Sequence, residues 1–194
     1  MTTPILSVND YIISTVAVEH EYPVFYNETV SFKSTAYDRG LHRLKIKLDI
    51  WLESQEDIKK FEAFILACRG RLNPFFLDLG DSADWLNPFT SKARSVSLSA
   101  PTVIGQSSIP LSGGYSNISP GDKFTLDNET KVYTVISRDT ATVEIVPALR
   151  YAHPSADKLN FENPRPLVRF NKDTISFEYD KSNKVSIELV EVQS

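Results

Sequence analysis

The chain has 194 residues, of which 41% are hydrophobic, and its formal net charge is -4. This length and apolar content suffice for one ordinary domain or two small ones with packed cores, and they argue against wholesale disorder. The acidic balance argues against nucleic-acid binding, which usually needs a basic face. A single cysteine, Cys68, excludes an internal disulfide framework.

The N-terminal sequence MTTPILSVNDYIIS has neither the basic start nor the long apolar run of a signal peptide. No stretch of the sequence approaches the ~20 apolar residues that a membrane span requires. We therefore expect a protein that is made and folded in a reducing cytoplasm and has no membrane partner.

Residues 41–52 alternate between apolar and polar side chains, which predicts a half-buried strand. Upstream, residues 24–37 are a second strand candidate. The sequence DRGLH between the two segments indicates a turn, so we predict that they pair as a β-hairpin.

Residues 54–70 change to helical spacing. Ser54 and Asp57 stand three residues apart, as in a capping box, and Gly70 suits a C-terminal cap. We therefore predict one principal helix that packs on the sheet. Its apolar face consists of Ile58, Phe61, Ile65 and Cys68, with Phe64 beside them.

The middle of the chain predicts a small β unit. A Ser-rich connection, residues 95–116, leads into a series of short strand candidates separated by polar turns, a pattern typical of a small barrel or sandwich. The candidate strands are residues 94–99, 107–112, 122–127, 131–138 and 141–146.

Longer alternating strands return at residues 167–173, 174–182 and 184–192. The resulting order predicts an insertion: residues 1–93 and 155–194 form one discontinuous domain, and residues 94–154 form an inserted barrel domain. We expect the last strand to pair with the N-terminal sheet. We also expect the outer strands to need nothing from the barrel for their burial.

Little in the sequence predicts chemistry. His20, His42 and His153 lie at no metal-ligand spacing and are expected to be ordinary surface or loop residues. Cys68 lies on the apolar helix face and is expected to be a small buried hydrophobe. No acid/base pair stands out, so we predict no catalytic residue, no metal site, no cofactor and no enzyme activity.

Three acidic residues, Asp78, Asp81 and Asp84, recur at three-residue spacing. This spacing differs from that of an EF-hand loop, so a solvated loop is favoured over a calcium site. A carbohydrate-binding module is the alternative function, because the barrel, Tyr115, Trp85 and this Asp loop could hold a glycan.

Small barrels also bind nucleic acids, for which exposed aromatic residues among basic ones are needed. Here the basic residues alternate with acidic ones, and Phe124 alternates with Leu126 as a core residue would. We therefore predict no sequence-specific nucleic-acid binding. The basic residues of the unit are Lys123, Lys131, Arg138 and Arg150.

Two groups of residues resemble a known family. In the first, a strand ending in Trp51 precedes a Phe-rich helix that ends at Arg69-Gly70, and a strand runs from Phe75 to Asp78. In the second, a PGD-x-F motif leads into a strand of the middle unit, and a strand with a V-x-I-x-P-x-L-R motif ends the unit. The second motifs are Pro120, Gly121, Asp122 and Phe124, then Val143, Ile145, Pro147, Leu149 and Arg150.

This layout resembles the distal tail proteins of long-tailed bacteriophages. The resemblance implies a mainly β fold with one principal α-helix, an α+β ring-forming tail domain, plus an inserted small OB-like β-barrel. It implies a structural virion protein at the tail tip. Its copies would form a ring, usually a hexamer, that joins the tail tube protein to the tail-tip hub or baseplate proteins. DNA would pass through the lumen, and the barrel would lie outside, near side fibres or host sugars.

Overall fold

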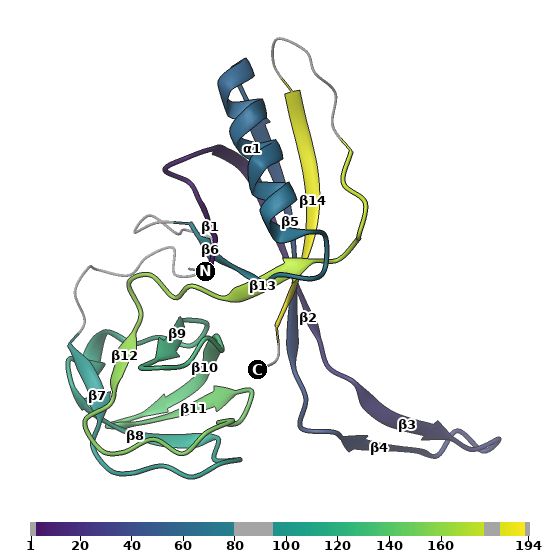
Figure 1. The fold of residues 1–194 in the computed structure, drawn as a ribbon. Helices are drawn as coiled ribbons and strands as arrows, with labels where there is room; N and C mark the ends of the chain where they lie inside the picture. The colour runs from purple at the N-terminus through teal and green to yellow at the C-terminus, as the bar shows by residue number, and fades with distance from the viewer. Residues whose placement is uncertain (1–2, 80–94, 177–182, 193–194) are drawn as a thin grey trace.

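A computed structural model describes residues 3–79, 95–176 and 183–192. The structure is mainly β, with 46% strand and one α-helix in the described part of the chain. Its strands form a six-stranded sheet, a closed six-stranded barrel and a separate two-stranded hairpin (Figure 1). The prediction of a mainly β fold that includes a barrel is therefore confirmed.

The six-stranded sheet combines strands from both ends of the chain. Its last strand, β14, pairs antiparallel with β5 from Asn183 opposite Leu52 to Val190 opposite Lys45, as the sequence predicted. Among the described strands of this sheet, only β1 and β6 pair in parallel. The order across the sheet is β1 (Ile5–Ser7), β6 (Phe75–Asp78), β13 (Leu167–Phe170), β14 (Asn183–Glu191), β5 (Arg43–Leu52) and β2 (Ile12–Glu21).

Helix α1 (Gln55–Cys68) covers one face of this sheet (Figure 1). The predicted capping box is present, because the Ser54 side chain accepts from the Asp57 amide and the Asp57 carboxylate accepts from the Ser54 amide. The helix ends one residue earlier than predicted, at a left-handed Arg69. Gly70 follows, also with positive φ.

The apolar face of α1 forms the centre of the main core. Phe61 is fully buried, and its ring meets the Tyr11 ring edge-on at a centroid distance of 5.5 Å. Phe64 makes a similar edge contact with Phe75 at 5.0 Å. Burying one such side chain contributes about 1.5–3 kcal/mol, so this cluster fixes the helix to the sheet.

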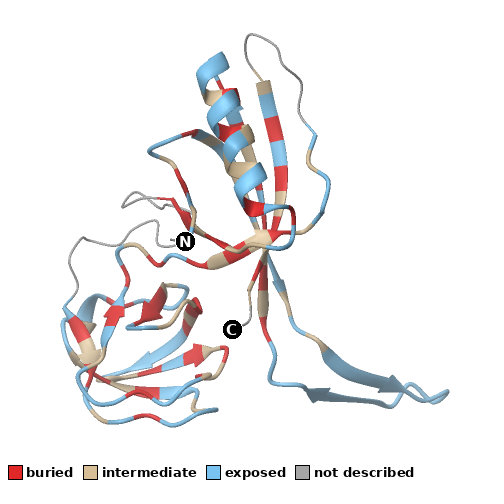
Figure 2. Ribbon diagram, viewed as in Figure 1, coloured by how far each residue is buried: buried red, intermediate tan, exposed pale blue. Residues whose placement is uncertain are grey.

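The predicted hairpin between residues 24–37 and 41–52 is wrong. Strand β5 pairs instead with β2, and the segment between them folds back on itself as β3 (Val24–Glu28) and β4 (Ser34–Asp38). A register shift between Ile13 and Thr15 interrupts the alternation of β2, which hides this strand in the sequence. Every residue of β3 and β4 is exposed (Figure 2). We call residues 24–38 the arm.

The barrel closes through antiparallel pairs, and the five strands predicted in this region are all present. A sixth strand, β12, lies beyond the predicted boundary at residue 154 and pairs with β7 and β9. The order is β10 (Tyr133–Asp139), β11 (Thr142–Val146), β8 (Ser108–Gly113), β7 (Val96–Leu98), β12 (Lys158–Asn160) and β9 (Lys123–Leu126), with a 3-10 turn η1 (Tyr115–Asn117).

The boundary of the barrel therefore needs correction. Leu159 and Phe161 are buried in the barrel's own hydrophobic core, although both were assigned to the outer domain. A strand of only three residues gives no usable alternation, which explains why the sequence did not reveal it. The predicted strand 174–182 lies partly outside the described residues, and its first three residues are not in a strand.

Candidate functional site

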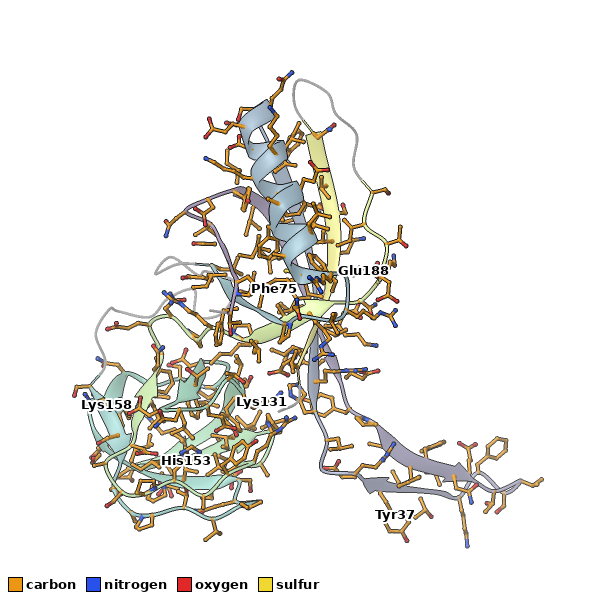
Figure 3. The ribbon with its side chains drawn as sticks, in the orientation of Figure 1. Tyr37, Phe75, Lys131, His153, Lys158 and Glu188 are labelled. Carbon is orange, nitrogen blue, oxygen red and sulfur yellow. The ribbon has the colours of Figure 1, made fainter. Side chains whose placement is uncertain are left out.

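The barrel meets the sheet through a buried polar cluster that the sequence did not predict. Lys131, labelled in Figure 3, lies in the connection before β10. It is buried although it carries an ammonium group. Its Nζ donates to the Glu191 carboxylate, to Nδ1 of His42 at 3.2 Å and to the His42 carbonyl at 3.3 Å. An ammonium group has three N–H donors, so these contacts satisfy it fully.

Glu191 connects the sheet with the segment of the barrel that contains Lys131. Its carboxylate lies at the end of β14 and accepts from the Leu44 amide of β5 at 3.0 Å. It also accepts from the Val132 amide at 3.4 Å, next to Lys131. Val132 itself packs into the core of the sheet. The expectation that the outer strands bury nothing against the barrel is therefore wrong.

His42 occupies the middle of the cluster and is buried. Because the Lys131 ammonium can only donate, Nδ1 of His42 must accept, and its proton lies on Nε2. That Nε2 donates in turn to Nδ1 of His20, 2.9 Å away. Both rings are therefore neutral in this arrangement. Arg150 donates to the His42 carbonyl at 3.1 Å.

The electrostatics agree with this assignment. Burial, together with the charges of Lys131, His20 and Arg150, lowers the pKa of His42 to about 3. Burial, with further help from Lys123 and Lys131, also lowers the pKa of His20. Desolvation lowers the pKa of Lys131, although the nearby Glu191 carboxylate acts in the opposite direction and raises it.

The third histidine is also buried, within the barrel. Nδ1 of His153 lies 3.0 Å from Asp157, and Nε2 lies 3.2 Å from Glu129. The Tyr133 hydroxyl donates to Glu129 at 2.5 Å. These contacts connect two loops of the barrel. The prediction that all three histidines are ordinary surface or loop residues is wrong for His42 and His153, because both are buried and their ring nitrogens have hydrogen-bond partners within the protein.

The predicted Asp loop is described only at its start. Asp78 is buried, pairs with Arg165 at 2.7 Å and accepts from Asn163 at 3.0 Å. The remaining members, Asp81, Asp84 and Trp85, lie outside the described residues. Among the residues that the structure describes, no group of three His, Cys, Asp or Glu side chains could hold a metal ion.

Tyr115, the other member of the candidate glycan site, packs partly buried against the barrel core. Its carbonyl, and that of Ser116, accept from Arg138. Lys123 donates to the Gly121 carbonyl at 3.4 Å. With Lys131 and Arg150 in the polar cluster, all four basic residues considered for nucleic-acid binding make contacts within the protein.

Cys68 is fully buried on α1, which confirms its predicted place on the apolar helix face. Burial raises the pKa of its thiol to about 11. Because the thiolate is the nucleophilic form, this side chain is chemically inert at neutral pH.

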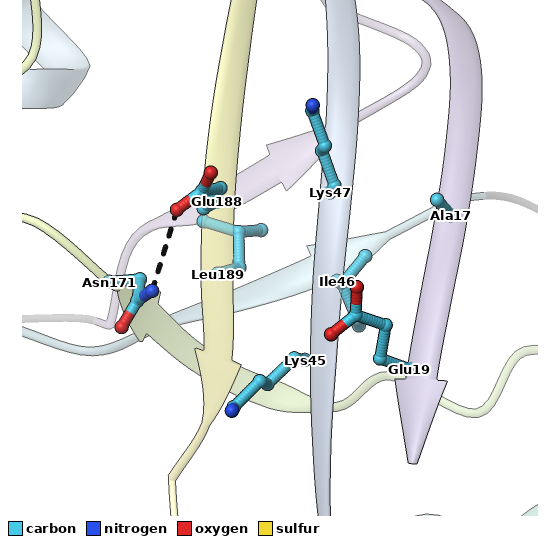
Figure 4. Close-up of a pocket in the computed structure, with 8 residues that line it drawn as sticks. All are labelled: Ala17, Glu19, Lys45, Ile46, Lys47, Asn171, Glu188 and Leu189. Atoms are coloured by element: carbon cyan, nitrogen blue, oxygen red, sulfur yellow. Dashed lines mark hydrogen bonds between the residues drawn. The ribbon is translucent and has the colours of Figure 1, made fainter. Parts of the chain in front are cut away.

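A shallow pocket lies on the face of the sheet opposite α1 (Figure 4). Lys45 and Lys47 of β5 border it together with Glu19 of β2 and Glu188 of β14, and Asn171 donates to Glu188 at 3.5 Å. Its charged groups have both signs, and two of them form ion pairs with neighbours outside the pocket, Lys45 with Glu21 and Glu188 with Lys172. This lining favours no particular class of ligand.

The arm exposes an unusual amount of aromatic surface. Phe25 and Tyr37 stand directly opposite each other across its two strands and are 64% and 67% exposed. Tyr26 and Phe32 are 61% and 85% exposed. A two-stranded hairpin alone is marginally stable in water, and exposed apolar patches of this kind usually mark protein contacts.

No family model matches the chain, and no curated protein matches it. In the described ranges, no helix has the length and hydrophobicity needed to cross a membrane.

Proposed function

We propose that this chain is a structural protein of a bacteriophage tail. Its copies form a ring, a hexamer, that joins the tail tube to the tail tip or baseplate, and DNA passes through the lumen. The motifs around Trp51, Arg69-Gly70 and Asp78 suggest this role. The described part of the fold supports this role, because the arm exposes apolar side chains. Such a surface is expected of a protein whose function is to bind other protein copies.

The arm is the observation that carries the proposal. In a ring, one surface of each copy binds a different surface of the next copy, and the contact repeats until the ring closes. The Phe25–Tyr37 pair offers such a surface because it extends from the sheet on strands that no other part of the described chain covers. Burial against a neighbouring copy would stabilise both the arm and the ring.

We further propose that the barrel is an OB-like module on the outside of the ring, where it contacts side fibres or neighbouring tail proteins. Its separate hydrophobic core, built around Phe124 and Phe161, supports this role. A module with a core of its own can be added to a ring protein without rebuilding the sheet.

The mass of the purified chain in solution, measured by light scattering and native mass spectrometry, tests the ring. We expect six copies, and ring-shaped particles in electron micrographs. The variant Phe25→Ser/Tyr37→Ser should shift the protein to monomers and leave its circular dichroism unchanged. Ile136→Ser, which alters an exposed apolar residue of the barrel, is the matched control and should remain hexameric. A parent protein that stays monomeric at high concentration would contradict the proposal.

The alternative, a carbohydrate-binding module, predicts a monomer that binds a glycan array. No described residue favours it at present, because Asp78 and Tyr115 are engaged in contacts within the fold. Binding of the parent protein to the array, with loss of binding in a Trp85→Ala variant, would support it over the ring.

A further inference from the structure

Protonation of the histidines in the polar cluster between barrel and sheet would remove hydrogen bonds that hold the cluster together. We call His20, His42, Lys131 and Glu191 the junction. In the junction, Nδ1 of His42 is an acceptor for Lys131, and Nδ1 of His20 is an acceptor for His42. A proton on either Nδ1 removes that acceptor. On His42 it also places a second cation 3.2 Å from the Lys131 ammonium.

The charges of Lys131, His20 and Arg150 disfavour that second cation on His42. Lys131 and Arg150 approach it from the barrel side and His20 from β2, and each is a cation or can become one. Glu191 of β14 is the one carboxylate among the described residues that contribute to the junction, and it already accepts from Lys131. The Tyr22 ring, 4.7 Å from the His42 ring, adds no charge.

We propose that the junction is an acid-sensitive latch, which fixes the barrel against the sheet while His42 and His20 are neutral and releases the barrel when they are protonated. The inference does not depend on the proposed ring. It concerns the two halves of one chain, each of which has its own core.

The direction of the pH dependence follows from the pKa of His42, which is about 3 in the closed junction instead of its ordinary value of 6.5. The stability of the closed state is therefore fully present above pH 6.5 and decreases as the pH falls toward 3. Over that range the ratio of open to closed molecules rises about tenfold for each pH unit, because only the open state binds the proton. The lowered pKa of His20 acts in the same direction.

The barrel's own buried histidine, His153, lies in a different environment, with Asp157 3.0 Å from Nδ1 and Glu129 3.2 Å from Nε2. Opening of the junction and unfolding of the barrel are therefore different events, and they can be measured separately.

Fluorescence resonance energy transfer within single full-length chains tests the latch. Dyes attached at Ala63→Cys, exposed on α1, and at Ser137→Cys, exposed on β10, report the position of the barrel relative to the helix. Cys68 remains unlabelled because its thiol is buried. Labelled chains are diluted into excess unlabelled protein, so that the signal comes from one chain.

We expect one narrow transfer distribution at pH 7.5 and a broad, reversible second one at pH 5, with unchanged circular dichroism. His42→Gln, which keeps a neutral acceptor for Lys131, should open much less than the parent at pH 5, because only His20 of the two histidines can then be protonated. Glu191→Gln should be partly open already at pH 7.5, because Lys131 loses its counter-charge. The proposal is overturned if the distributions do not change with pH, if His42→Gln opens as the parent does, or if opening coincides with loss of β structure.

Discussion

The ion pair of Lys131 and Glu191 differs in kind from those on the surface of the same protein. Both of its side chains are at most 3% exposed, whereas Lys60 and Glu56 on α1 are 60% and 76% exposed. A buried charge that loses its partner cannot recover its hydration, but an exposed one can. The energetic importance of each residue therefore follows from its burial more than from its contact distance.

We predict that Lys131→Met lowers the free energy of unfolding by about 3–5 kcal/mol, because it leaves the Glu191 carboxylate buried and unpaired. The double variant Lys131→Met/Glu191→Gln should lose less, since the amide oxygen can still accept from Leu44. Lys60→Ala should change stability by about 0.5 kcal/mol or less. Urea denaturation at pH 7.5 measures all three. A double variant less stable than Lys131→Met would contradict this account.

Gly70 and Gly40 provide a second comparison between single residues. Both have positive φ, 61° and 64°, but a Cβ on Gly70 would lie 2.9 Å from Cα of Asp173, whereas Gly40 has open space. Gly40→Ala should therefore lose only about 1 kcal/mol from backbone strain. Gly70→Ala should lose clearly more, because the clash involves backbone atoms. Equal melting temperatures of the two variants would show that residues 70 and 173 separate easily.

At the scale of elements, α1 is held by a few aromatic contacts. Phe61 is fully buried against Tyr11, whereas Leu66 on the same helix is 68% exposed. The capping box at Ser54 sets where the helix begins, and Gly70 allows the chain to turn back toward β6. Local sequence thus fixes the ends of the helix, and burial of its apolar face fixes its position.

Phe61→Ala should destabilise the protein by about 3–5 kcal/mol, through lost burial and the cavity that remains. This is a large part of the roughly 5–15 kcal/mol that stabilises a typical domain, so partly insoluble protein is expected. Leu66→Ala is the control and should melt within a few degrees of the parent. Thermal unfolding followed by circular dichroism distinguishes the two. Similar losses in both variants would mean that α1 packs differently.

The described part of the molecule consists of a sheet domain that carries the arm and a barrel that has a core of its own, and the two meet at the junction. The cores are separate because the barrel closes on itself, so that Phe124, Phe161 and their neighbours are buried without the sheet. The two halves are nonetheless coupled, since Val132 enters the core of the sheet and Lys131 covers Glu191. The barrel therefore contributes to the burial of residues in the sheet domain.

We predict that replacing residues 95–161 by a Gly/Ser linker leaves a soluble sheet domain with its helix intact. The protein should stay soluble because water can then hydrate the Glu191 carboxylate, and because the deletion removes every apolar strand of the barrel. Replacing only residues 96–150 should give a less soluble protein, because Leu159 and Phe161 lose the core that buries them. Circular dichroism and solubility of the two variants decide between these outcomes. If the longer deletion unfolds, the barrel belongs to the main core.

The sequence by itself determined the elements that depend on neighbours along the chain. The alternation of Leu44 to Ile50 gave β5, and the Ser54–Asp57 spacing gave the start of α1. The burial of Cys68 followed from its place on the helix face. The sequence did not reveal the pairing of β2 with β5, because a register shift interrupts the alternation of β2, and the arm between these two strands was therefore missed. Strand β12 was missed because three residues are too few to show an alternation.

Only the tertiary structure decided the junction. His42 and Lys131 are 89 residues apart, and Lys131 and Glu191 are 60 apart, so no spacing along the chain could connect them. The sequence predicted His42 as an ordinary surface or loop residue and Lys131 only as a basic residue of the barrel, and a polar side chain in a loop gives no local sign of burial. Glu191 did have such a sign, because the alternation of β14 places it on the same face as Val185, Ile187 and Leu189. Whether such a residue lies in water or in a buried hydrogen-bond network depends on which distant segments cover it. For this protein, local periodicity set the strands and the helix, and the contact between barrel and sheet set the chemistry of the junction.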